Sequence, residues 1–184
     1  MALTPWRLSY CRASSYPMTS VDDSLEDLPE KLNLGCGWDY RDGWHNVDIR
    51  EECQPDEVVD LDEYPWPWED DTFEHVRAWN VVEHVQDLHH TLNELHRIVS
   101  PGGTIAVAFP HPAGRSQWID PTHEHTLLPE TFQHELAPDG WEITHTNVSK
   151  VRFGRMLPDR WAMWWADHLG FLIDEIQLEL EIVE

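Results

Sequence analysis

The sequence predicts an α/β domain in which helices cover both faces of a mostly parallel sheet and the last strand is antiparallel. Two observations support this class. Short apolar stretches alternate with turn-forming connections along residues 31–109, which is the pattern of strands joined by crossovers. Apolar residues also recur at helical spacing along residues 85–99. At 184 residues, the chain is long enough for one well-packed domain.

The first predicted strands follow from these apolar stretches, at residues 31–36, 45–49, 57–61, 75–81 and 103–109. Only eight residues, 37–44, separate the first two strands. A parallel connection normally needs about a dozen residues or more and usually holds a helix. We therefore expect the first crossover helix to be shortened to a turn.

The segment from Val85 to Val99 carries apolar residues at spacings of three and four, which predicts an amphipathic helix. Pro101-Gly102-Gly103 follows and is expected to stop this helix. The preceding loop, residues 64–71, contains two prolines, which exclude a regular helix there. The two tryptophans of this loop either wall a bound ligand or fill a gap that the short crossovers leave.

Residues 1–28 are predicted to form an N-terminal extension to a domain of residues 29–184. Its role, as a flexible arm, a lid or a clasp for another subunit, is open, and an oligomer is possible. The C-terminal part is predicted to hold a short helix at residues 132–136, a strand at 141–152, a Trp-rich helix at 158–169 and the final strand at 173–183.

The composition is strongly acidic, with 35 Asp and Glu against 12 Lys and Arg and a net charge of −23. Such a surface repels free nucleic acid, because non-specific binding depends on cationic contacts to phosphate. The few lysines are also typical of salt adaptation, where counterions screen self-repulsion. The three cysteines show no C-x-x-C spacing, and no apolar run is long enough to span a membrane. We therefore expect a cytoplasmic protein with no membrane contact.

A glycine turn, Gly35-Cys36-Gly37, follows the first predicted strand and can bring the backbone close to a ligand. Dinucleotide sites use a longer turn with a third glycine, which Trp38 and its neighbours do not supply. Asp48 ends the second strand 11 residues after Gly37, instead of the roughly 20 of the dinucleotide pattern. Asp48 can accept hydrogen bonds from a ribose diol or can cap a loop. The pattern favours a nucleoside cofactor without a pyrophosphate.

The sequences LNLGCG, at residues 32–37, and GWHNVD, at residues 43–48, resemble the class I S-adenosylmethionine-dependent methyltransferases, especially small members. The resemblance covers most of residues 31–132 and implies a Rossmann-like fold with S-adenosylmethionine as cofactor. It also implies that the first motif, at the methionine end of the cofactor, is Asn33, Gly35, Cys36 and Gly37. The family often has an acid at the position of Asn33, whose amide can still hydrogen-bond an ammonium group.

The same resemblance assigns further cofactor contacts. Asp48 matches the ribose-binding acid, and Asp60 matches the acid that faces the adenine amino group, with the backbone N–H of Leu61 meeting the ring. The segment WNVVEH, at residues 79–84, resembles the family's strand-four motif, which often ends in Glu-His. Asn80 in this motif is expected to contact the cofactor. His84 ends this motif and is a candidate general base, or a structural histidine at the start of a helix.

The segment Asp120-Pro121-Thr122-His123 resembles a loop in which small methyltransferases bind acceptors, and it implies a substrate-facing role for His123. A metal site made by His111, Asp120, His123 and His125 is the alternative. No cysteine or spaced carboxylate set supports zinc there, so we predict no metal site.

We expect methyl transfer to an oxygen or nitrogen of a small-molecule or glycan-like acceptor. Positioning supplies most of the catalysis, and a base is needed only if the acceptor must lose a proton. Two alternatives remain. Asn33 and the short crossovers favour a catalytically degenerate binding or assembly protein. Three arginines, Arg152, Arg155 and Arg160, would serve an RNA methyltransferase.

Overall fold

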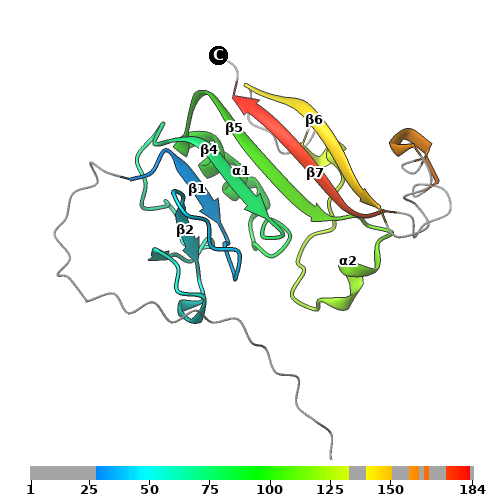
Figure 1. Ribbon diagram of the computed structural model, residues 1–184, viewed down its shortest axis with the longest axis horizontal. Helices are drawn as coiled ribbons and strands as arrows, with labels where there is room; N and C mark the ends of the chain where they lie inside the picture. Colours follow the sequence, from blue (N-terminus) through cyan, green and yellow to red (C-terminus); the bar gives the residue numbers. More distant parts are fainter. Residues whose placement is uncertain (1–27, 133–139, 151–157, 162–163, 166–172, 183–184) are drawn as a thin grey trace, which may run out of the picture.

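A single mixed sheet organises the computed structural model (Figure 1). The structure describes residues 28–132, 140–150, 158–161, 164–165 and 173–182. Their strands follow the order β3-β2-β1-β4-β5-β7-β6. The parallel part comprises β1 (Lys31–Leu34), β2 (His45–Asp48), β3 (Glu57–Val58), β4 (Phe73–Trp79) and β5 (Val99–Pro110).

The C-terminal strand β7 (Ile173–Ile182) pairs antiparallel with both β5 and β6 (Trp141–Lys150). The predicted fold class, a mostly parallel Rossmann-like sheet with an antiparallel C-terminal strand, is therefore confirmed. From β1 the chain adds β2 and β3 on one side and then returns to add β4 and β5 on the other side. Because β1 and β4 pair in parallel, their carboxyl ends lie beside each other at the lower edge of the sheet in Figure 1. In open α/β sheets such a reversal is where ligands bind.

The first crossover holds turns only, as the sequence predicted. Its backbone is organised by Asn46, a fully buried residue of β2. The Asn46 amide nitrogen donates to the carbonyl oxygens of Arg41 (3.0 Å) and Trp44 (2.8 Å), and its oxygen accepts from Arg41 N at 2.9 Å. These hydrogen bonds satisfy backbone groups that a helix would otherwise satisfy. The second crossover is also short and contains the 3-10 helix η2 (Glu51–Cys53).

Helix α1 (Leu88–Ile98) is shorter at both ends than the predicted 85–99. At its start, the Asp87 carboxylate accepts from His90 N at 2.9 Å and caps the first turn. At its end, Val99 already pairs with Phe73 as the first residue of β5. Pro101-Gly102-Gly103 consequently lies inside β5, and β5 begins earlier than predicted.

Strand β4 also ends earlier than predicted, at Trp79, because Asn80 adopts a left-handed conformation with φ 50°. Strand β3 is only two residues long instead of the predicted five at 57–61. β6 and β7 match the predicted C-terminal strands within the described residues. Helix α2 (Arg115–Ile119), which lies beyond the carboxyl end of β5 in Figure 1, was not predicted.

The tryptophans of the third crossover, Trp66 and Trp68, are 2% and 3% exposed and belong to the core. Trp68 packs edge-on against Phe73 with ring centroids 5.6 Å apart. Of the two alternatives, these residues fill the gap that the missing crossover helices leave. Arg97 of α1 fixes this loop, because its guanidinium donates to the carbonyl oxygens of Trp68 (2.7 Å) and Trp66 (3.3 Å).

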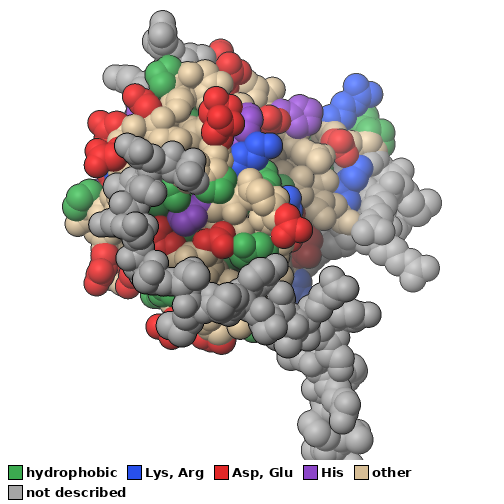
Figure 2. Space-filling view, turned by 60° about the vertical axis from the view of Figure 1, so that its left-hand side comes forward, with side chains coloured by type: hydrophobic (Ala, Val, Ile, Leu, Met, Phe, Trp, Pro, Cys, Tyr) green, Lys and Arg blue, Asp and Glu red, His purple; other side chains and the backbone are tan. Residues whose placement is uncertain are grey.

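Several sequence predictions lie wholly or partly outside the described residues. These are the N-terminal extension, the short helix at 132–136, the end of the strand at 141–152 and most of the helix at 158–169. Among the described residues, no helix has the length and apolar character needed to cross a membrane. On the face shown in Figure 2, Asp and Glu side chains are widely distributed, while Lys and Arg occupy fewer places.

Candidate cofactor and acceptor site

A pocket of about 870 Å³ opens where the parallel strands end. We call it the strand-end pocket. One wall comes from the ends of β1, β2 and β3, another from the segment after β4, and a third from the loop after α2. The lining residues include Gly35, Asp48, Arg50, Asp60, Leu61, Asp62, Asn80, His84, Gln86, Asp120, Thr122 and Glu124.

Gly35 brings the end of β1 to this pocket in a conformation that requires glycine. Its φ is +63°, and a Cβ atom here would lie 2.5 Å from Cγ2 of Val81. Gly37, with φ +50°, directs its N–H to Oδ2 of Asp48 at 2.7 Å. The glycine turn is therefore tied to the carboxylate at the end of β2.

Asp48 is 6% exposed and still ionised. Burial raises its pKa, but hydrogen bonds from Arg50 and from the Gly37 N–H outweigh burial and hold the pKa below its ordinary value. Its Oδ1 atom accepts from Arg50 N at 3.0 Å and from Arg50 Nε at 3.1 Å. Oδ2 accepts from Gly37 N at 2.7 Å and only weakly from Arg50 Nη2, at 3.5 Å, so Oδ2 is the oxygen that can accept a further hydroxyl donor.

Asp60 and Leu61, for which the family resemblance implies contacts with adenine, line the pocket together with Asp48. Asp60 Oδ1 accepts from Asp62 N at 3.0 Å, which fixes the turn. Asp62 in turn accepts from Gln86 N at 2.8 Å and joins this turn to the segment before α1. Arg50, Asp62 and Gln86 were not singled out from the sequence, and no motif marked them.

Asn33 does not reach the pocket wall. It is fully buried, and its amide nitrogen donates to Asp39 O (2.8 Å) and to Asn46 Oδ1 (3.0 Å). Its oxygen accepts from Arg77 Nη1 at 3.0 Å. Asn33 therefore braces the first crossover from inside.

Cys36, like Asn33, does not line the pocket. Its side chain is 3% exposed, and burial raises the pKa of its thiol to about 11. Its backbone N–H donates to Val47 O at 2.8 Å and joins the glycine turn to β2. Of the four residues of the first motif, Gly35 alone lines the pocket within the described residues.

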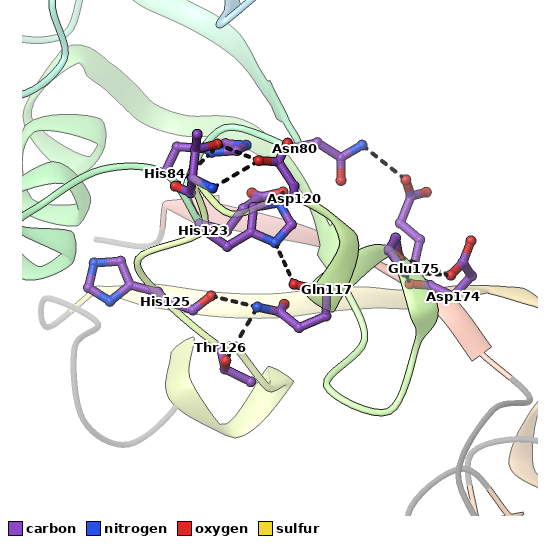
Figure 3. A network of polar contacts seen from close by, with 12 residues as sticks. Asn80, His84, Gln117, Asp120, His123, His125, Thr126, Asp174 and Glu175 are labelled. Atoms are coloured by element: carbon purple, nitrogen blue, oxygen red, sulfur yellow. Dashed lines mark hydrogen bonds and ion pairs between the residues drawn. The ribbon is translucent and has the colours of Figure 1, made fainter.

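The other end of the pocket is formed by Asn80, His84 and Thr122. Asn80 donates from its backbone to Ala108 O at 2.8 Å and from its side chain to Glu175 Oε2 at 3.2 Å. His84 Nδ1 lies 3.0 Å from Thr122 Oγ1 and 3.2 Å from Thr122 O (Figure 3). Hydrogen bonds from the hydroxyl and N–H of Thr122 hold the pKa of Asp120 below its ordinary value.

His123 lies beside His84, with ring centroids 4.8 Å apart (Figure 3). Its Nδ1 atom is 2.9 Å from the carbonyl oxygen of Gln117, in α2. The two histidines predicted to face the acceptor are thus brought together, although their positions differ by 39 in the sequence. His84 lines the pocket and His123 lies behind it.

Glu83, which was not proposed as a site residue from the sequence, is 1% exposed and has its carboxylate within 4.8 Å of ring nitrogens of both histidines. Burial raises the pKa of its carboxyl to about 7. Its carbonyl oxygen accepts from the N–H groups of Glu124 (2.9 Å) and His125 (3.1 Å), which fixes the loop after α2 to the turn after β4. The Glu-His pair at the end of the strand-four motif was the available signal.

The pocket fits a nucleoside cofactor with an amino-acid tail. Small-molecule sites span about 300–1,000 Å³, and the volume of this one falls within that range. Carboxylates at Asp48 and Asp60 suit the hydroxyl and amino donors of an adenosine, and apolar lining from Ile49, Val59 and Leu61 suits its ring. The sheet order is that of a Rossmann-like protein, and the pocket suits a nucleoside cofactor.

Residues 6–170 match the family model described as Methyltransferase domain, so the chain belongs to this family. No curated protein matches the chain. The family and the shared fold identify a class I S-adenosylmethionine-dependent methyltransferase domain, imply S-adenosylmethionine as the cofactor, and support methyltransferase activity.

Solved structures share the fold at low sequence identity. An S-adenosylmethionine-dependent methyltransferase from Mesorhizobium loti is 17% identical, with a TM-score of 0.57 over 82% of this chain and 90% of that one. One from Archaeoglobus fulgidus is 18% identical, with a TM-score of 0.57 over 82% and 85%. The [4+2]-cyclase SpnF is 16% identical, with a TM-score of 0.58 over 86% and 76%. This cyclase illustrates that the fold alone does not fix the reaction.

Proposed function

We propose that this protein transfers the methyl group of S-adenosylmethionine to an oxygen or nitrogen of a small-molecule or glycan-like acceptor. The observation that carries the proposal is a continuous pocket whose wall runs from Asp48, at the end of β2, to His84 and Asp120. A nucleoside held at Asp48 would direct its amino-acid end along the strand ends, and the acceptor would enter beside His84.

The cofactor end depends on three groups. The ionised Asp48 accepts hydrogen bonds from the ribose hydroxyls, Asp60 accepts one from the adenine amino group, and the Leu61 backbone N–H donates to the ring. Gly35 lets the backbone turn sharply at the pocket wall beside the methionine part, in a conformation where a side chain would collide with Val81. When bound, the cofactor would supply a methyl group on a sulfonium, whose sulfur would keep the electrons of the broken carbon–sulfur bond and depart as a neutral thioether.

The acceptor end depends on His84. A carbonyl oxygen only accepts, so the contact between His84 Nδ1 and Thr122 O places the proton of the neutral ring on Nδ1. The Nε2 atom then carries a lone pair. We propose that the acceptor atom forms a bond to the methyl carbon as the carbon–sulfur bond breaks, and that His84 Nε2 takes the acceptor's proton.

The acceptor class follows from the charge of the pocket. Acidic residues line it at Asp60, Asp62, Asp120 and Glu124, and Arg50, the one Lys or Arg among the described lining residues, is paired with Asp48. Such a wall suits hydroxyl-rich or amine acceptors and disfavours phosphate. Two of the three arginines considered for RNA, Arg152 and Arg155, lie outside the described residues.

The test is His84→Ala with methyl-labelled S-adenosylmethionine and panels of sugars, amines and RNA. Removing a general base is expected to lower methyl transfer by about 100-fold or more, while cofactor affinity stays within about twofold. His89→Ala, an exposed histidine of α1, is the matched control and should behave as wild type. An unchanged rate in His84→Ala would contradict the base. Wild-type protein that binds cofactor and methylates nothing would favour the degenerate module.

A further inference from the structure

We propose that Glu83, His84 and His123 bind a divalent first-row transition cation, such as Zn²⁺, at the acceptor end of the strand-end pocket. In the part of the chain that the structure describes, they form the one group of metal-ligating side chains whose donor atoms converge, all within 4.8 Å of one another. The site differs from the histidine set considered from the sequence, because it draws two ligands from the turn after β4.

The Glu83 carboxylate is the first argument. Its side chain is 1% exposed, and neither of its oxygens has a hydrogen-bond partner. The ion-pairing contact that it makes is with His123, where Oε1 lies 4.0 Å from Nε2. A buried charge with no close partner is costly unless it is paired or coordinates a metal. A bound cation would supply the missing partner.

The orientation of the histidines is the second argument. Metal-ligating imidazoles usually donate the N–H of the other ring nitrogen to a carboxylate or a backbone carbonyl. His123 Nδ1 lies 2.9 Å from Gln117 O, and His84 Nδ1 lies 3.2 Å from Thr122 O. Both carbonyls can only accept, so both neutral rings carry the proton on Nδ1 and present a lone pair at Nε2.

The ligand set selects the class of cation. Two imidazoles and one carboxylate suit zinc and its neighbours, whereas Mg²⁺ and Ca²⁺ prefer oxygen ligands. Zinc bonds of about 2.1 Å in tetrahedral geometry hold ligand atoms about 3.4 Å apart, so binding requires the three side chains to move together by roughly 1 Å. Three protein ligands leave a coordination position open, as in catalytic zinc sites.

His84 lines the pocket, so the open position would face the acceptor. A coordinated hydroxyl or amine loses its proton more easily, and His84 would then act on the acceptor through the cation instead of as a free base. This consequence rests on the proposed function. The binding site itself does not, because cation binding can be measured without methyl transfer.

The experiment is calorimetric titration of chelator-treated full-length protein with Zn²⁺, repeated with Co²⁺ to record the absorption bands of the bound cation. Wild-type protein is expected to bind one equivalent with Kd of about 1 μM or tighter. Glu83→Gln and His123→Ala should each weaken binding by about 10-fold or more. His89→Ala should not change it, which separates this site from adventitious binding among the 12 histidines.

Glu83→Gln is expected to fold, because it removes a buried charge and keeps the shape of the side chain. Circular dichroism checks each variant before titration. Folded wild-type protein that takes up no Zn²⁺ would overturn the proposal, and so would equal affinity in wild type and in Glu83→Gln. A protein that binds Zn²⁺ tightly and shows no methyl transfer would keep the site and contradict the proposed function alone.

Discussion

Two buried glutamates of this protein, Glu83 and Glu94, have opposite surroundings. Both are almost inaccessible to solvent, at 1% and 6%. Glu94 accepts from Arg97 at Nε (2.8 Å) and Nη2 (2.7 Å) and from Trp66 N at 2.7 Å. Glu83 has no hydrogen-bond partner on either carboxylate oxygen.

Their pKa values reflect this difference. Hydrogen bonds from Arg97 lower the pKa of Glu94, whereas burial, with smaller contributions from the charges of Glu175 and Asp120, raises the pKa of Glu83 to about 7. The Glu94 pair holds the tryptophan loop in the core and thus serves the fold. The Glu83 carboxylate makes no hydrogen bond to the described residues, and it lies beside His84, which lines the pocket. A buried carboxylate without a partner indicates a candidate functional site, whereas a fully paired buried carboxylate indicates a structural role.

The largest expected effect comes from Arg97→Met. The change leaves Glu94 buried without its cation and frees the carbonyl oxygens of Trp66 and Trp68. Removing one partner of a largely buried pair is expected to lower the free energy of unfolding by about 3 kcal/mol, measured by urea denaturation. Arg41→Met, which disrupts an exposed pair with Asp39, is the control and should cost less than about 1 kcal/mol. Equal losses of unfolding free energy in Arg97→Met and Arg41→Met would contradict a special role for the buried Glu94 pair.

An intermediate effect of opposite sign is expected from Glu83→Gln in the presence of a chelator at pH 8. Replacing a buried, unpaired carboxylate by its neutral isostere should raise the free energy of unfolding by about 1 kcal/mol. Glu94→Gln should lower it, because the bidentate contact with Arg97 is lost. A loss of stability in both variants would mean that the Glu83 carboxylate has a structural partner.

The smallest effect is a pH dependence. The pKa of Glu94 is lowered from 4.5 in the folded protein, so its contribution to stability is fully present above about pH 4.5 and is lost as the pH falls through the lowered value. The difference in unfolding free energy between wild type and Glu94→Gln should therefore shrink in acid. Denaturation curves at pH 7 and pH 3.5 check this, and a constant difference would contradict it.

The sequence predicted the fold class and the positions of the strands along the chain well, because both follow from apolar stretches and turn residues. The short first crossover followed from the eight residues available for it. The limits of α1 and β5 did not follow, because Val99 continues the apolar spacing of the helix yet pairs with Phe73. Helical periodicity does not register a strand partner 26 positions earlier in the chain.

The site was predicted less evenly. Gly35, Asp48, Asp60, Leu61, Asn80 and His84 were proposed from the motif resemblance and line one pocket. Asn33 was proposed from the same resemblance but does not line the pocket. Its side chain is instead hydrogen-bonded to Asn46, Asp39 and Arg77. The approach of His123 to Glu83 depends on how the loop after α2 folds back, which no local pattern records.

The most direct test of the account is calorimetric titration of S-adenosylmethionine into wild-type protein and Asp48→Ala, in dilute and in molar potassium chloride. Wild-type protein is expected to bind with Kd of about 100 μM or tighter. Loss of the Asp48 carboxylate should weaken binding by about 10-fold or more. Circular dichroism checks that both proteins are folded, and Asp60→Ala provides a second pocket variant. Folded wild-type protein without affinity for the cofactor, or equal affinity in all three proteins, would contradict the placement of the site.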